Sequence, residues 1–440
     1  MLVKSVTPVV CMKFLMNLKS NFFLGLTWNY ASLLILGIGG LTINVFIVTN
    51  YNIDALGKFN KIYALYIVLS QFGVAGLHYS SLRYISEHTK NIATSRVIVN
   101  SALIVVVIIN IFMCAILYFT SGFFNLLFDD MNMDKALEIL IPALFLFSIN
   151  KVFLFSLNGF QLMRLYAVGN MIRVLSMMIY VIICSLYDVN EKYLIYCFFI
   201  AEFLLILYHV AIYLFFNYKY LGGLNLVFSN EWISKHLSFG SRSMLGGALQ
   251  ELNTRIDILF VAFFLSDNQV GIYSFAAILA EGFYLIQTVV KNSINPLLTR
   301  HIVNKNKEAF YKLKNRIFKY IYPFTFILAI VLIFIYKPIL SHIFAEHELH
   351  VSWLVFTIYI LFYSSVSGFV PFENILSQSN YPFEQSMVSL IRTLTNIILN
   401  ILLIPTFGLY GAVMGTGFSI LIGTVVLVIL VRNKLDLKLT

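Results

Sequence analysis

A few charged side chains lie inside stretches of the chain that are otherwise apolar. The phrase LNTRIDILFV, residues 252–261, holds Arg255 and Asp257, and Glu251 directly precedes it. A charge at the centre of a bilayer costs about 2.5–3.5 kcal/mol or more, so such residues mark substrate paths, ion paths or structural pairs. On a helix Glu251 and Arg255 share one face in the favourable order, whereas Asp257 points roughly 200° away from Arg255. One face could serve transport and the other packing, or the pair could be purely structural.

Other ionisable residues lie in similar surroundings. Two arginines occupy a shared phrase, MIRVLSMMI at 171–179 around Arg173 and LIRTLTNII at 390–398 around Arg392. Each could line a cleft, or could extend its charged end to the membrane surface. The remaining candidates are Lys291, Glu281, Glu202 and Glu373.

The composition indicates whether these charged residues belong to a membrane protein or to a soluble one. Of 440 residues, 60% are hydrophobic and 11% are charged, and the mean hydropathy is +0.86. Soluble domains have roughly 45–50% apolar and 25% charged residues. Long apolar runs without a two-residue alternation predict helices rather than barrel strands, because only these structures satisfy their backbone groups in lipid.

Apolar runs of about 20 residues predict twelve spans with short connections and no inserted soluble domain. We place the spans at 22–49, 59–84, 96–119, 137–160, 165–187, 193–216, 238–265, 271–296, 320–343, 351–376, 382–405 and 409–431.

The distribution of lysine and arginine predicts the orientation. Nineteen of them fall at alternate junctions and at the two ends, whereas the opposite side has only Lys58, Lys61, Lys135, Lys192 and Lys337. Positive charge collects on the cytoplasmic side, so both termini are predicted to be cytoplasmic. The net charge of +10 is then mostly a topology signal and does not indicate nucleic acid.

Repeated phrases indicate duplication. The two arginine phrases lie about half a chain apart, as do Gly57 in LGKFN (56–60) and Gly271 in VGIYS (270–274). Six spans per half give a parallel repeat. We therefore predict an all-α polytopic membrane protein of about twelve transmembrane helices, in two pseudo-symmetric six-helix lobes around a central cleft. Its parts are a basic cytoplasmic N-terminus (1–20), the lobes (21–216 and 238–431), a cytoplasmic linker (217–237) and a tail (432–440).

The turn DALGKF (54–59), the phrases NTRIDIL (253–259) and DNQVGIYS (267–274), and YGAVMG (410–415) resemble the polysaccharide transporters of the multidrug/oligosaccharidyl-lipid/polysaccharide flippase superfamily. Within it, the chain is most similar to the O-antigen or repeat-unit flippases, the Wzx type. This resemblance implies a multi-pass protein of the bacterial inner membrane that moves an undecaprenyl-pyrophosphate-linked oligosaccharide to the periplasmic leaflet. A polysaccharide polymerase and a chain-length regulator are the protein partners that it implies.

Such a substrate carries a pyrophosphate that is costly to desolvate. Charge-assisted bonds from cationic side chains would stabilise it, and arginine suits phosphate geometry. The substrate-binding candidates are therefore Arg255, Arg173, Arg392 and Lys291. No catalytic residue and no metal site are expected.

The absence of a nucleotide-binding motif limits the energy sources that transport could use. The chain has no G-x-x-x-x-G-K-[ST] phosphate loop, so we expect secondary transport without a cofactor. A coupling ion, H⁺ or Na⁺, could drive it, and Glu251, Asp257 and Glu281 are the candidate groups.

Two rival functions remain open. A drug/cation antiporter of the same superfamily would favour an acidic cleft. An integral-membrane glycan polymerase or glycosyltransferase would need a sizeable outer loop, and the largest here spans about residues 120–136.

Overall fold

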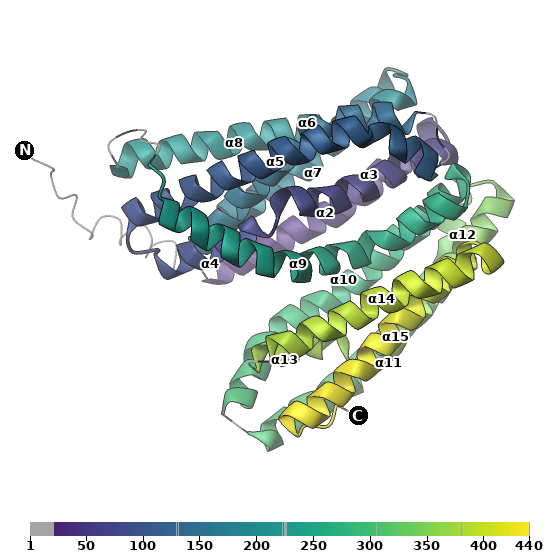
Figure 1. The fold of residues 1–440 in the computed structure, drawn as a ribbon. Coiled ribbons are helices and arrows are strands. Elements are labelled where there is room, and N and C mark those ends of the chain that lie inside the picture. The colour runs from purple at the N-terminus through teal and green to yellow at the C-terminus, as the bar shows by residue number, and fades with distance from the viewer. Residues whose placement is uncertain are drawn as a thin grey trace, which may run out of the picture. The chain divides into compact units, whose positions relative to one another are not determined.

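A computed structural model describes residues 22–128, 130, 132–221, 223, 227–304, 306–379 and 381–439. The predicted basic N-terminus, 1–20, lies outside these residues. Within them the regular structure is helical (Figure 1). The helices are α2 (Phe22–Asn50), α3 (Ile53–Val74), α4 (Leu77–Glu87), α5 (Ile92–Phe128), α6 (Met133–Gly159), α7 (Met163–Leu186), η1 (Glu191–Tyr193), α8 (Tyr196–Leu221), α9 (Asn230–Phe264), α10 (Asp267–Val303), α11 (Lys307–Leu340), α12 (Glu346–Val366), η2 (Val370–Phe372), α13 (Ile375–Gln378), α14 (Pro382–Phe407) and α15 (Leu409–Leu435).

The twelve predicted spans fall on these helices. Ten described helices are long and apolar enough to cross a membrane, and the bent pair of α3 and α4 makes eleven. The twelfth predicted span, 238–265, falls on α9, a helix of 35 residues whose charged side chains make it less apolar than those ten. The all-helical, polytopic fold class is thus confirmed.

One predicted span is broken. The sequence predicts a continuous helix over 59–84, but α3 and α4 meet at an angle of 53°. Ala75 and Gly76 both have positive φ, 47° and 72°, which ends the helical hydrogen bonding. The Asn110 side chain of α5 donates a 2.8 Å hydrogen bond to the freed carbonyl of Gly73. Hydropathy misses the break because alanine and glycine do not interrupt an apolar run.

A second predicted span ends early. The sequence predicts a helix over 351–376, whereas α12 ends at Val366 and is followed by the short helices η2 and α13. Glu373 therefore lies in a turn between η2 and α13 rather than on a continuous helix. Its carboxylate can be approached from several helices at once.

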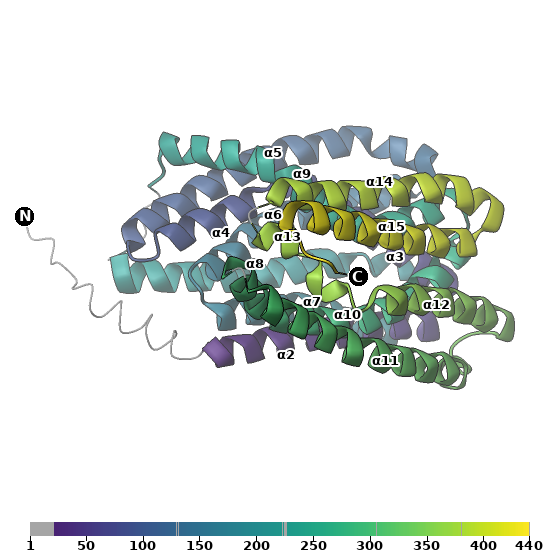
Figure 2. The same ribbon diagram turned by 90° about the horizontal axis from the view of Figure 1, so that it is seen from below.

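The chain divides into two compact units, residues 1–46 with 66–248, and residues 47–65 with 249–440. These boundaries lie inside α2, α3 and α9, and they differ from those of the predicted lobes, which stay a prediction. In the first unit α6 packs against α4, α5 and α8. In the second, α14 runs along α15, and α12 packs against α10, α11 and α15 (Figures 1 and 2).

The repeated phrases occupy matching places on their helices. Gly57 lies four residues after Ile53, the start of α3, and Gly271 lies four residues after Asp267, the start of α10. Arg173 and Arg392 each lie ten residues after the first residue of α7 and α14. This common register is what an internal duplication predicts.

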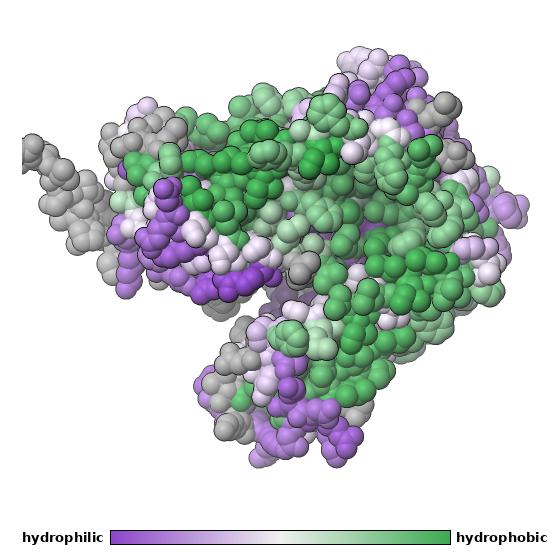
Figure 3. Space-filling model, viewed as in Figure 1, coloured by the Kyte–Doolittle hydropathy of each residue, from purple (hydrophilic) through white to green (hydrophobic). Residues whose placement is uncertain are grey.

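Apolar side chains cover the middle of the helices, and hydrophilic ones gather near their ends (Figure 3). That distribution suits helices that cross a hydrocarbon layer.

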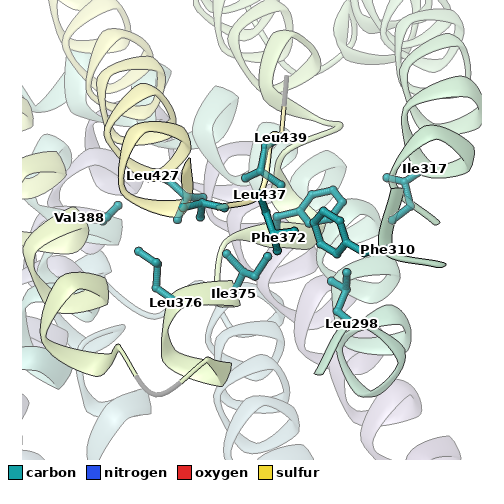
Figure 4. Close-up of a cluster of buried hydrophobic side chains, with 11 residues drawn as sticks. Leu298, Phe310, Ile317, Phe372, Ile375, Leu376, Val388, Leu427, Leu437 and Leu439 are labelled. Atoms are coloured by element: carbon teal, nitrogen blue, oxygen red, sulfur yellow. The ribbon is translucent and has the colours of Figure 1, made fainter. Parts of the chain in front are cut away.

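The segment after α15 closes one end of the second unit. Leu437 and Leu439 are 6% and 0% exposed and pack with Phe310 and Phe372 (Figure 4). The intervening Asp436 forms an ion pair with Lys307 of α11, with Nζ and Oδ2 2.5 Å apart. Alternate apolar residues thus face the core while charged ones stay outside, and the segment packs beside Phe372, the residue before Glu373.

Candidate functional site: intramembrane charges

A close helix crossing brings α3 and α10 together in the second unit. A Cβ atom on Gly57 would lie 1.7 Å from the backbone oxygen of Asp267, and one on Gly271 would lie 2.3 Å from that of Ile53. Each glycine thus packs on the carbonyl four residues before the other. Only glycine allows backbones to approach this closely.

Polar contacts extend the same crossing. Asn60 donates a 2.9 Å hydrogen bond to Ser274 Oγ, and these residues lie three positions after Gly57 and Gly271. Lys61 and Asp267 form an ion pair of 2.8 Å in which the lysine side chain is 3% exposed. The sequence places Lys61 among the loop residues of the outer side, but the structure places it on α3, buried against α10. Matching positions of the two repeated phrases therefore meet, and they fix α10 relative to α3.

Arg255 of α9 pairs with Glu281 of α10. Its two terminal nitrogens lie 3.2 and 3.4 Å from the two carboxylate oxygens, a two-point geometry that favours strong binding. The guanidinium also stands over the ring of Tyr63, 5.3 Å from its centroid. Glu251 lies one turn away on the same helix. Arg255 therefore has an acidic partner on the neighbouring helix that sequence spacing did not indicate.

Asp257 has a different environment. Its side chain is 5% exposed, and Oδ2 accepts hydrogen bonds from the hydroxyls of Tyr273 (2.8 Å) and Tyr359 (2.7 Å). The two hydroxyls are 2.5 Å apart. A carboxylate with hydroxyl donors can release them when it takes up a proton or a cation, so Asp257 is suited to ion exchange.

A third group surrounds Glu373. Lys291 of α10 lies 2.9 Å from one of its oxygens, and Arg392 of α14 lies 3.7 Å from the other. Tyr284 donates to that second oxygen at 2.7 Å. Two cations thus share one carboxylate, and the group keeps an excess positive charge.

Tyrosine rings connect the last two groups. Tyr359 stacks on Tyr363 with centroids 5.8 Å apart, and Tyr363 lies 5.0 Å from Tyr284. A row of aromatic hydroxyl side chains therefore runs from Asp257 to Glu373 through the second unit. The sequence reasoning missed these tyrosines, because α10 and α12 are apolar overall and nothing in their spacing singles the tyrosines out.

The first unit has its own ion pair. Arg173 of α7 and Glu202 of α8 are 2.6 Å apart, and Glu202 is 1% exposed. Glu202 also accepts hydrogen bonds from Tyr66 (3.1 Å) and Asn150 (2.8 Å). The guanidinium of Arg173 lies 4.6 Å from the ring centroid of Phe147, which the Lys151 ammonium also approaches at 5.4 Å. Arg173 is therefore held inside the helix bundle rather than extended to a membrane surface.

The predicted residues thus fall into separate groups. Within the second unit lie Arg255 with Glu281, Asp257 with two tyrosines, and Lys291 with Arg392 on Glu373; Arg173 belongs to the first unit. Among the described residues, no group of three His, Cys, Asp or Glu side chains could hold a metal ion.

Two family models match parts of the chain. The family model described as "Polysaccharide biosynthesis protein" matches residues 19–281, and the MatE model matches residues 243–402. No curated protein sequence matches the chain.

Solved structures share the fold over most of the chain. One is the lipid II flippase MurJ in an inward closed conformation, at 17% identity and a TM-score of 0.72, with 92% of this chain and 87% of that one covered. Another is an inward-facing multidrug resistance MATE family transporter of the MOP superfamily, at 12% identity, a TM-score of 0.75 and coverages of 91% and 94%. A third is the Vibrio cholerae MATE transporter VcmN, at 13% identity, a TM-score of 0.63 and coverages of 96% and 98%.

The first family model covers more than half of the 440 residues, and the solved structures show the same fold. The chain accordingly belongs to the polysaccharide biosynthesis protein family.

Proposed function

We propose that the protein moves an undecaprenyl-pyrophosphate-linked oligosaccharide, such as an O-antigen repeat unit, from the cytoplasmic to the periplasmic leaflet of a bacterial inner membrane. Both termini are cytoplasmic in this proposal, and transport proceeds by alternating access. A polymerase and a chain-length regulator would receive the product.

One observation supports the proposed class of substrate. Lys291 and Arg392 converge on the single carboxylate of Glu373, so the two cations share one acidic partner. A buried charge without full compensation is costly, and an incoming pyrophosphate would provide that compensation. The 3.7 Å separation of Arg392 from Glu373 is longer than a strong charge-assisted bond, so this arginine can transfer its donors to a phosphate at low cost. Arg255 and Arg173 are further candidate ligands.

The test is export of surface polysaccharide in a flippase-deficient strain. Arg392→Met and Lys291→Met should each lower export about tenfold or more, since a bond to a charged group contributes roughly 1.5–3 kcal/mol. The control is Lys337→Met, which removes a lysine whose ammonium lies over the Trp353 ring at 4.4 Å, far along α11 from its cytoplasmic start. Equal losses in all three variants at matched membrane levels would refute the substrate role of the Glu373 group.

We also propose that Asp257 is the group that couples transport to H⁺ or Na⁺. Glu281 is engaged by Arg255, whereas Asp257 is held by hydroxyls. Tyr273 also contacts Thr416, and Thr416 lies 3.5 Å from Asn396 Oδ1. Asn400 donates to the same oxygen at 2.9 Å. Oxygen atoms of this kind suit a hard monovalent cation or a transferred proton.

Asp257→Asn should abolish the response of transport to an imposed Na⁺ or pH gradient, because the amide cannot change its charge. Tyr359→Phe removes one donor and keeps the ring, so an intermediate response is expected. The measurement is the initial rate in proteoliposomes with and without each gradient. A gradient response in Asp257→Asn equal to that of the unaltered protein would refute the coupling role.

A further inference from the structure

The first unit contains an apolar cavity that no part of the proposed transport site uses. Its volume is about 100 Å³, and it lies between the turn before α5, the end of α6 and the end of α8. Eight apolar residues line it, together with Arg96 and seven polar residues. The apolar lining residues are Ile92, Val99, Phe153, Leu157, Phe160, Leu162, Ile212 and Phe216.

The cavity extends along the helices. Tyr220 lies next to the last residue of α8, and His209 lies twelve residues before that end, which corresponds to about 18 Å along a helix. Both residues line the cavity. It therefore runs from the level of the helix ends into the depth of one leaflet. With the predicted topology, that leaflet is the cytoplasmic one.

Hydrocarbon is the chemistry that fits the walls. A cavity needs roughly 10–15 Å³ to hold one water, and apolar cavities of this size class stay dry and bind apolar molecules. Water inside would lack hydrogen-bond partners along most of the surface. A chain of methylene groups would instead gain contacts on all sides.

Arg96 provides the charge. It lies four residues after the start of α5, at the shallow end of the cavity, and it donates one long hydrogen bond of 3.4 Å to the carbonyl of Gly223. Among the residues that the structure describes, no carboxylate pairs with it. Its buried Nε has no hydrogen-bond partner, and neither has Oδ1 of Asn217, a cavity-lining residue that is 3% exposed. An arginine with unused donors beside an apolar cavity calls for an anion that carries a hydrocarbon chain.

We propose that this cavity, the Arg96 cavity, binds part of one acyl chain of an anionic phospholipid of the cytoplasmic leaflet, with the phosphate on Arg96. Basic side chains between membrane helices on the cytoplasmic side bind such headgroups. A hydroxyl on the headgroup, as in phosphatidylglycerol, would donate to Asn217. The site is separate from the Glu373 group and does not depend on the identity of the transported substrate.

The probe is spin-labelled phosphatidylglycerol, compared with spin-labelled phosphatidylcholine, on the full-length protein in phosphatidylcholine nanodiscs. The fraction of immobilised phosphatidylglycerol should exceed that of phosphatidylcholine. Arg96→Gln should lower the relative affinity for phosphatidylglycerol about fivefold, which is the contribution of one basic residue to the binding of anionic lipid. The matched control is Arg83→Gln, which removes an exposed arginine of α4 that is paired with Glu87.

A second variant tests the binding of the acyl chain independently of the Arg96 charge. Ile212→Phe adds volume to the cavity wall and should displace the immobilised chain while Arg96 remains. Inorganic phosphate at millimolar concentration should not compete if a lipid is the ligand. Equal immobilisation of the two lipids, equal loss in the Arg96 and Arg83 variants, full competition by phosphate, or an unchanged signal in Ile212→Phe would each overturn the proposal.

Discussion

Alanine at Gly57 or Gly271 is expected to destabilise the protein and abolish transport. The new Cβ would lie 1.7 Å from the Asp267 oxygen or 2.3 Å from the Ile53 oxygen, and both obstacles are backbone atoms that cannot rotate away. Overpacking of this kind costs about 1–3 kcal/mol. The measurements are the midpoint of thermal unfolding in detergent and the export of polysaccharide.

Gly282 on the same helix, α10, supplies the control. A Cβ there meets nothing within 4 Å, so Gly282→Ala should leave transport intact and raise stability by about 0.4–1 kcal/mol through the unfolded state. A gain of stability in Gly282→Ala and a loss in Gly271→Ala would show that the close approach of two backbones, and not helix propensity, decides the effect at Gly271. A rise in the unfolding midpoint for Gly57→Ala or Gly271→Ala would contradict the crossing.

Removal of the Arg255 guanidinium is expected to give the other large effect. If Arg255 transfers its donors to a pyrophosphate, Arg255→Ala should reduce export about tenfold or more while the protein still accumulates in the membrane. Arg255→Lys should retain part of the activity, because the charge remains and the two-point geometry is lost.

A double variant separates binding from scaffolding. Arg255→Ala leaves the carboxylate of Glu281 without its arginine, and removal of both partners of a buried pair is often much milder than removal of one. If the pair only stabilises the contact of α9 with α10, Arg255→Ala/Glu281→Ala should restore export. Under the substrate role, the double variant stays inactive, and full activity in it would refute that role for Arg255.

The spans could be predicted from the sequence because hydropathy requires only local composition. The break between α3 and α4 could not, since Ala75 and Gly76 interrupt the helix through backbone dihedral angles and not through polarity. Hydropathy also missed the early end of α12, although Pro371 in the short helix η2 is a helix-breaking residue that the sequence shows. α9 is the opposite case. Its charged side chains make it less apolar, but its length and its apolar stretches still predicted a span.

The candidate charges were found in the same way, but their partners were not. Spacing on one helix pointed from Arg255 to Glu251, whereas the ion pair forms with Glu281, 26 residues further along. The convergence of Lys291 and Arg392 on Glu373 likewise depends on how three separate elements pack. Helical periodicity indicates which residues share a face, and it carries no information on which helix that face meets.

The repeated phrases were an exception to this limit. Matching phrases at about half the chain length placed Gly57 and Gly271, and Arg173 and Arg392, at the same positions of their helices. The contact of the two glycines followed from neither phrase alone, because it needs α3 and α10 to cross at those residues.

Translocation by the purified protein tests the proposed function most directly. Proteoliposomes would carry a fluorescent undecaprenyl-pyrophosphate-linked oligosaccharide in one leaflet, and a membrane-impermeant quencher would report its arrival in the other. We predict protein-dependent transfer that slows about tenfold or more in Arg392→Met, with no accumulation of ethidium by the same vesicles. Uptake or efflux of ethidium, together with no transfer of the oligosaccharide lipid, would contradict the proposed function and identify a drug/cation antiporter.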